Sequence, residues 1–179
     1  MFQKPRFKKS NTVSKQDSMT SEEFKEILFS KDPKWPDEIV VSESLFLDGC
    51  TSLTQLPQCL AVRGRLDLSG CTGLTSLPQG LTVSGVLSLE GCTGLSSLPQ
   101  GLTVSGHLYL SGCTGLTCLP PGLIVKKSLF LNDCNSFSYL PQDMVVKGYL
   151  ALDADSFLLK PRIKNGQIPK SRFQILKES

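Results

Sequence analysis

The apolar positions of this chain recur every 21 residues through its middle. The phrase LDLSGCTGLTSLPQGLTVSGV begins at Leu66, and close or looser copies begin at Leu45, Leu87, Leu108, Leu129 and Leu150. Three further columns keep the same register: Cys50, Cys71, Cys92, Cys113 and Cys134; Leu56, Leu77, Leu98, Leu119 and Leu140; Pro57, Pro78, Pro99, Pro120 and Pro141. A fixed period of this size is typical of a solenoid, in which each repeat buries its apolar face against its neighbours.

Within one repeat, the segment TVSGVLSLEGC alternates between apolar and polar side chains. Val83, Leu87 and Leu89 fall on one face, whereas Ser88 and Glu90 fall on the other. A period of two predicts one strand per repeat with its Val and Leu pointing into the core, so that about six strands build one parallel sheet. The Gly and Pro residues that follow predict a turn and an irregular or 3₁₀ return segment.

The chain divides into four parts: a disordered basic tail at 1–19, an N-terminal helical cap at 20–40, the repeats at 41–153 and a C-terminal cap at 154–179. The tail is polar and has no periodicity. Thr20 to Glu23 reads T-x-x-E, a capping box, and predicts a helix over about 21–30. Together with Trp35, this helix would cover the open end of the core. Asn165–Gly166 is a turn signal, which favours a capping strand or hairpin after the last repeat.

The charges of the chain are segregated. Residues 1–20 carry five Lys/Arg and one Asp, and residues 154–179 carry six basic and two acidic groups. Residues 45–153 carry five basic and six acidic groups, so the net charge of +3 belongs to the ends rather than to the repeats. Such termini are typically solvated and flexible. No apolar region follows the N-terminal charges, so we expect no classical export signal, and no apolar run approaches the ~20 residues of a membrane-spanning helix.

Five of the seven cysteines occupy one repeat position, and Cys59 and Cys118 fall elsewhere in the phrase. In a stack of repeats the column would place its sulfurs about 4.8 Å apart, but with parallel Cβ vectors. A disulfide needs converging Cβ vectors. We therefore expect reduced, structural thiols, as in a cytosol.

The phrase resembles the leucine-rich repeat, and the L-x-L-x-G-C-x-x-L-x-x-L-P pattern around Leu66, Leu68, Cys71 and Leu74 resembles its cysteine-bearing variant. The resemblance implies an α/β repeat fold: a leucine-rich-repeat solenoid with a concave parallel sheet and an irregular or 3₁₀ convex side. It also implies that the cysteine column is held inside the turn and bonds to the backbone of neighbouring repeats. Short arrays of this kind are similar to those of effector proteins secreted by intracellular bacteria.

The residues offer little catalytic chemistry. His107 is the only histidine, and strand parity places it outward whereas Cys113 belongs to the inward turn, so a nucleophilic pair is not expected. No C-x-x-C motif or phosphate-binding glycine loop is present. The carboxylates of Asp48, Asp67 and Glu90 would lie on an open surface rather than in a cleft. We therefore expect no catalytic residue, no cofactor and no metal, and no small-molecule substrate.

The outward positions of the sheet carry the remaining signal. Exposed aromatic side chains along one face form a contiguous apolar patch, of the kind that interfaces use. The candidate protein-binding residues are Phe46, Arg65, Asp67, Val86, His107, Tyr109, Phe130 and Tyr149. The central aromatics would supply affinity, with Arg65 and Asp67 as polar rim contacts. Two other interpretations stay open: the aromatics pair across strands for stability, or the caps partly cover them.

The leading hypothesis is a non-enzymatic protein-protein interaction module. It would act as a bacterial effector that binds a host protein, or another effector or enzyme whose active site its concave face occludes. We expect it in the bacterial cytoplasm and then, by leaderless secretion, in the host cytosol. The alternative is peripheral membrane or RNA binding through the basic termini, with the repeats as a spacer. An enzyme is the weakest reading, because residues 154–179 are too few for the ubiquitin-ligase domain that some family members carry.

Overall fold

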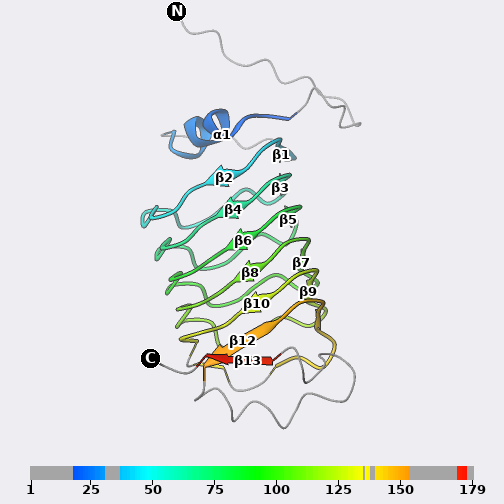
Figure 1. Ribbon diagram of the computed structural model, residues 1–179. Helices are drawn as coiled ribbons and strands as arrows, with labels where there is room; N and C mark the ends of the chain where they lie inside the picture. The colour runs from blue at the N-terminus through cyan, green and yellow to red at the C-terminus, as the bar shows by residue number, and fades with distance from the viewer. Residues whose placement is uncertain (1–17, 31–36, 135, 138–139, 154–172, 177–179) are drawn as a thin grey trace, which may run out of the picture.

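The computed structural model describes residues 18–30, 37–134, 136–137, 140–153 and 173–176. It is a β-solenoid in which every repeat contributes two short strands to two parallel sheets (Figure 1). The first sheet has six strands: β1 (Ile39–Val41), β3 (Leu60–Val62), β5 (Thr82–Val83), β7 (Thr103–Val104), β9 (Ile124–Val125) and β11 (Val145–Val146). The second sheet has seven: β2 (Leu45–Phe46), β4 (Leu66–Asp67), β6 (Leu87–Ser88), β8 (Leu108–Tyr109), β10 (Leu129–Phe130), β12 (Leu150–Asp153) and β13 (Phe173–Leu176).

The register of both sheets follows the sequence repeat. Leu45 pairs with Leu66, and Leu66 with Leu87, so each strand lies beside its equivalent 21 residues later. The last pair differs, because Leu150 is opposite Phe173, 23 residues on. The strand predicted beyond the repeats is thus present as β13, parallel to β12. The Asn165–Gly166 turn lies outside the described residues.

The prediction of a single strand per repeat is wrong, because a corner divides the alternating segment in two. The corner consists of three residues between the strands, for example Ser84 to Val86 between β5 and β6. A Cβ atom on Gly85 would lie 2.5 Å from the carbonyl oxygen of Gly64, the equivalent glycine one repeat earlier. Because glycine has no side chain, the corners stack this closely and the chain changes direction there. The inward parity of Val83 and Leu89 is nevertheless as predicted, and both are buried.

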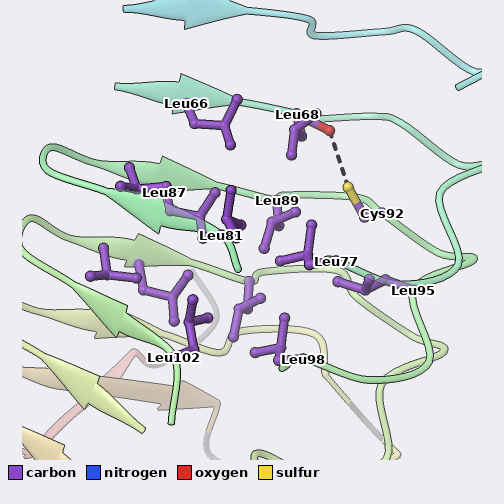
Figure 2. Close-up of a cluster of buried hydrophobic side chains, with 14 of the residues drawn as sticks. Leu66, Leu68, Leu77, Leu81, Leu87, Leu89, Cys92, Leu95, Leu98 and Leu102 are labelled. Atoms are coloured by element: carbon purple, nitrogen blue, oxygen red, sulfur yellow. Dashed lines mark hydrogen bonds between the residues drawn. The ribbon is translucent and has the colours of Figure 1, made fainter. Parts of the chain in front are cut away.

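The core is a set of leucine columns that run along the stack. Figure 2 shows Leu66 and Leu87 from the second sheet, Leu81 beside the first sheet, and Leu77 and Leu98 from the return segment, all pointing into one interior. Each of these side chains is buried. The return segment is irregular, and no 3₁₀ helix occurs in the described part of the chain. Stacking of equal side chains at a fixed spacing is what makes one repeat stabilise the next.

The cysteine column forms a ladder of thiol–carbonyl hydrogen bonds. The Cys92 thiol donates to the Leu68 carbonyl at 3.1 Å (Figure 2), and the same bond recurs from Cys71 to Leu47, Cys113 to Leu89 and Cys134 to Leu110 at 3.0–3.1 Å. Each carbonyl belongs to the preceding repeat, so the implied bonding to neighbouring repeats is confirmed. Cys50 departs from the prediction: it is only partly buried, because it lies in the first repeat of the column.

Burial also makes these thiols unreactive. The apolar surroundings raise the pKa of Cys71 to about 12 and that of Cys92 to about 11, and they raise the pKa of Cys113 as well. A thiolate, rather than a thiol, is the nucleophile, so these groups stay protonated near neutral pH. Cys59, in contrast, is exposed, and Cys118 is partly exposed.

The N-terminal cap begins as predicted. Helix α1 (Ser21–Leu28) starts at Thr20, whose side chain accepts from the Glu23 backbone N–H while the Glu23 carboxylate accepts from the Thr20 N–H. Phe24 of this helix is fully buried. The Glu43 carboxylate accepts from the Ser21 N–H and hydroxyl at 2.9 and 3.0 Å, which ties α1 to the first corner. These bonds lower the pKa of Glu43.

Met19, which the sequence assigns to the tail, is already part of the fold. It is buried and forms a parallel bridge with Val41, so it covers the free edge of β1. Trp35, the other proposed cap residue, lies outside the described residues. Among the described residues no helix has the length and apolar character needed to cross a bilayer.

Candidate functional site

The outer face of the second sheet carries most of the predicted site. On the six strands from β2 to β12 in this sheet the side chain between two buried leucines points away from the core, as Asp67 does between Leu66 and Leu68. The last residue of the preceding corner lies two positions earlier and belongs to the same face. We call these positions the second-sheet outer face: 46, 67, 88, 109, 130 and 151 on the strands, and 44, 65, 86, 107, 128 and 149 at the corners.

Three of its side chains form an aromatic cluster: His107, Tyr109 and Phe130. Tyr109 and Phe130 are register partners on β8 and β10, and their rings stack with centroids 4.6 Å apart and planes 3° from parallel. The His107 ring lies 6.0 Å from Tyr109 and 6.1 Å from Phe130. All three are partly exposed. Because the two rings are stacked and both are partly exposed, they form one continuous aromatic ridge on this face.

His107 also has a structural role that the sequence did not indicate. Its Nδ1 atom accepts from the Ser128 backbone N–H at 3.2 Å, so Nδ1 carries a lone pair and the neutral tautomer has its proton on Nε2. Two serines act in the same way: Ser44 Oγ accepts from the Arg65 N–H, and Ser128 Oγ accepts from the Tyr149 N–H. Where this corner position holds Ser or His, its side chain therefore caps the next repeat's backbone.

A polar network lies beside the aromatic cluster on the same face. The Arg65 guanidinium contacts the Asp67 carboxylate at 2.6 Å. The other carboxylate oxygen accepts from the Ser69 N–H at 3.1 Å and the Ser69 hydroxyl at 2.6 Å. Ser69 and Ser88 share a further hydrogen bond of 2.8 Å between their hydroxyls. The network therefore joins two neighbouring repeats.

Asp67 is largely buried within this network rather than exposed at a rim. Burial alone would raise its pKa, but the two bonds from Ser69 and the ion pair with Arg65 outweigh burial and lower the pKa. The Arg65 Nε–H is buried and has no hydrogen-bond partner. Arg65 is thus held by its terminal nitrogen, and about 41% of its side chain stays exposed. It remains available to a ligand, whereas Asp67 chiefly orients it.

The basic residues of the repeats and two of the acidic ones lie along two opposite edges of this face. Every Lys and Arg between residues 37 and 153 falls at a corner: Arg63, Arg65, Lys126, Lys127 and Lys147. At the other ends of the strands lie Asp48 and Glu90, both exposed, which are equivalent to Ser69 in their own repeats. The face therefore has a basic edge at the corners, an acidic edge at the turns, and aromatic and polar side chains between them.

The eight predicted residues form two groups and three separate positions. His107, Tyr109 and Phe130 form the aromatic cluster, and Arg65 and Asp67 form the ion pair. Phe46 and Tyr149 are about half exposed but stand at opposite ends of the face, and Val86 is partly buried. Prediction missed Ser69 and Ser88. The i, i+2, i+4 spacing of Arg65, Asp67 and Ser69 on one strand face was the available signal for the first.

The remaining surface offers little chemistry of another kind. No group of three or more His, Cys, Asp or Glu that could hold a metal occurs among the described residues. Two hollows of about 260 and 280 Å³ lie off this face, beside Gln79 and Pro99. Their walls consist of Gln, Ser, Thr, Gly, Pro, Leu and Val, so they supply no charged or aromatic group that would orient a small molecule.

No protein-family model, no curated protein and no solved structure matches the chain.

Proposed function

We propose that this chain is a non-enzymatic protein-binding module that docks a partner protein on the second-sheet outer face. The proposal includes the finer assignments that its repeat phrase suggests: a leucine-rich-repeat protein of the cysteine-bearing type, and a bacterial effector that acts on a host protein or on another effector. Support for the effector assignment comes from the resemblance of the phrase alone. Support for the binding face comes from the molecule itself.

The observation that carries the proposal is where two nearly identical repeats differ. Residues 66–86 and 87–107 differ at four positions, and one of these is a Thr75/Ser96 exchange. The other three exchanges are Asp67/Ser88, Ser69/Glu90 and Val86/His107. All three lie on the second-sheet outer face or at its turn edge. Solvent exposure does not account for this, because the exposed Thr72/Thr93 and Gln79/Gln100 pairs are identical.

The chemistry of the face suits a protein partner. The aromatic cluster supplies apolar area on rigid side chains, and Arg65 supplies donors held in place by Asp67. Tyr and Arg are the residue types that dominate binding energy at interfaces. The absence of a candidate metal group among the described residues leaves this face as the best-defined functional feature.

The test compares partner capture by three full-length proteins. We expect Tyr109→Ala plus Phe130→Ala to lower partner affinity by roughly 2 kcal/mol or more, about 30-fold, because both rings lie at the centre of the face. Gln79→Ala plus Gln100→Ala, on a different side, should bind as the wild type does. Both variants are first checked for native circular dichroism and melting. Equal recovery of every wild-type partner by the aromatic variant, measured by quantitative mass spectrometry, would refute the proposal.

A further inference from the structure

The corner before β10 breaks the repeat pattern and introduces two positive charges. Where the two preceding repeats read Ser84–Gly85 and Ser105–Gly106, this repeat has Lys126–Lys127. Both lysines are exposed. They directly precede Ser128, Leu129 and Phe130. The two charges therefore lie in the corner that leads into the aromatic cluster.

Packing does not explain this lysine pair. At the equivalent position of the preceding repeat, a Cβ on Gly106 would lie 2.4 Å from the Gly85 carbonyl oxygen. Lys127 brings a Cβ to this crowded column, and its N–H bonds to the Gly106 carbonyl at 3.2 Å, against 2.9 Å from Gly106 to Gly85. Glycine returns at Gly148 in the next repeat. The corner thus has a charged side chain where the neighbouring repeats have glycine, which points to a role outside the fold.

The nearby carboxylates do not neutralise the pair. Across the return segment, the Asp143 carboxylate accepts from the Gly122 N–H at 2.8 Å, so it is used within the stack. Asp133 lies beyond the far end of β10, at the turn edge of the face. Corner residues 105–107, 126–128 and 147–149 include no acidic residue. This part of the basic edge therefore attracts negative charge.

We propose that the partner segment bound by this face is acidic and carries aromatic or aliphatic side chains. Its carboxylates meet Lys126 and Lys127, and its apolar side chains pack on the aromatic cluster. This inference rests on the proposed function and adds the chemistry of the partner. Complementary charges across an interface fix orientation and speed encounter, and close pairs also add affinity, so the lysines would set the register of the segment on the aromatic ridge.

The charge pattern favours a narrow peptide segment over an anionic plane. A membrane surface or a nucleic acid duplex laid on this face would meet the basic edge and the acidic edge together. Asp48 and Glu90 on the acidic edge would repel its phosphates. A segment placed along the corner and the aromatic cluster meets the lysines without covering that edge.

The experiment uses polymer probes of known chemistry and four full-length proteins. The probes are a random glutamate–tyrosine copolymer, polyglutamate, a lysine–tyrosine copolymer, and phosphatidylserine-containing vesicles. The proteins are the wild type, Lys126→Gln plus Lys127→Gln, Tyr109→Ala plus Phe130→Ala, and the control Gln58→Glu plus Gln100→Glu. The lysine variant and the control both lower the net charge by two, and the control residues are exposed on another side. The basic tail is present in all four.

We expect the wild type to bind the glutamate–tyrosine copolymer more tightly than polyglutamate. The lysine variant should bind this copolymer about tenfold more weakly, whereas the control should stay within about twofold, because local charge and not net charge is at issue. The aromatic variant should bind the copolymer no better than polyglutamate.

The inference would be overturned by equal loss in the lysine variant and the control, by preference for the lysine–tyrosine copolymer, or by lysine-dependent binding to the vesicles alone. Failure of the wild type to bind the acidic copolymer would also overturn it. If the lysine variant still captures the wild-type partners while the aromatic variant does not, the proposed function stands without the acidic partner. If the aromatic variant keeps both the partners and copolymer binding, the proposed function itself fails.

Discussion

The two faces of the second sheet differ in how much their side chains vary between repeats, although the residues of both faces alternate along the same strands. The inward positions are leucine in all six repeats, at 45, 66, 87, 108, 129 and 150 and again two residues later in each. The outward positions between them hold Phe46, Asp67, Ser88, Tyr109, Phe130 and Ala151. An inward side chain must fit its own copies one repeat away, whereas the outward side chains range from the half-exposed Phe46 to Asp67 and Ser88, which are buried within the polar network. The stack therefore keeps its inner side constant and its outer side free to carry chemistry.

The turn and the corner repeat this contrast at the strand ends. At the turn, four buried cysteines make one identical bond to the preceding repeat. At the corner, the side chain before each second-sheet strand changes from Ser44 to Arg65 to His107. Some of these side chains still bond to the next repeat's backbone. A position where every repeat has the same side chain is one that the fold requires. A position where the side chain differs between repeats is one whose identity the fold does not restrict.

The largest expected effect comes from placing charge on the inner side. Leu89→Asp would bury a carboxylate between Leu68 and Leu110, where every side chain nearby is apolar and fully buried. An unpaired buried charge costs several kcal/mol, so we expect loss of the folded state. Soluble yield and thermal melting by circular dichroism measure this. A melting temperature close to that of the wild type would contradict the assigned interior.

Removing one step of the thiol ladder should have the next largest effect. Cys92→Ala deletes a fully buried sulfur and its 3.1 Å bond to the Leu68 carbonyl. We expect a loss of about 2 kcal/mol in the free energy of unfolding, because a small cavity and an unpaired carbonyl remain. Urea titration measures it. Cys59→Ala, at an exposed thiol, is the matched control and should change nothing measurable.

The same ladder predicts a loss of stability at alkaline pH. The folded-state pKa values of Cys71 and Cys92, about 12 and about 11, lie above the ordinary value of 9.0. Between these limits the unfolded chain releases protons that the folded chain keeps, so the free energy of unfolding falls as pH rises above 9. The expected loss is about 1 kcal/mol per thiol between pH 9 and pH 10. Cys71→Ala plus Cys92→Ala should reduce this slope in urea titrations, with the contribution of Cys113 remaining; an unchanged slope would argue against it.

On the outer side, a polar deletion should cost less. Asp67→Ala removes the ion pair with Arg65 and the bonds from Ser69, and we expect a loss of about 1 kcal/mol at neutral pH because the site is partly solvated. The folded-state pKa of Asp67 is lowered, so its contribution is present above pH 3.8 and is lost as pH falls through the folded value. Wild type and variant should therefore converge in stability at low pH. A gap that persists in acid would mean that Asp67 acts through packing.

The sequence reveals the inner side far better than the outer side for a physical reason. Leucine columns and the cysteine column follow from the period alone, and the capping box at Thr20 and Glu23 specifies its helix locally. The corner does not show in the alternation, because Val83 and Leu87 keep the same parity whether or not the strand breaks. The break is a matter of how the corners stack between repeats, with the N–H of Gly85 bonded to the Gly64 carbonyl and that of Lys127 to the Gly106 carbonyl.

The candidate site is predictable only in part, because its contacts cross between strands. Stacking of Tyr109 on Phe130 follows from the 21-residue register, and that register was known from the sequence. The bond between Ser69 and Ser88 joins residues 19 apart, so it depends on side-chain reach that no period describes. The Nδ1 bond of His107 to the Ser128 backbone depends in the same way on corner geometry.

The smallest expected effect on stability is that of Glu90→Ala. It tests the difference between the inner and outer sides most directly, because Glu90 is the residue next to Leu89. Glu90 is exposed at the turn edge, and its backbone carbonyl accepts from the Gly70 N–H at 2.7 Å. Glu90→Ala keeps that carbonyl, and the equivalent positions Ser69 and Ser111 show that the turn forms without a carboxylate. We expect a change within about 0.5 kcal/mol in urea titration. A loss comparable to that of Leu89→Asp would mean that inside and outside are exchanged on this strand, and the second-sheet outer face would then be the wrong surface.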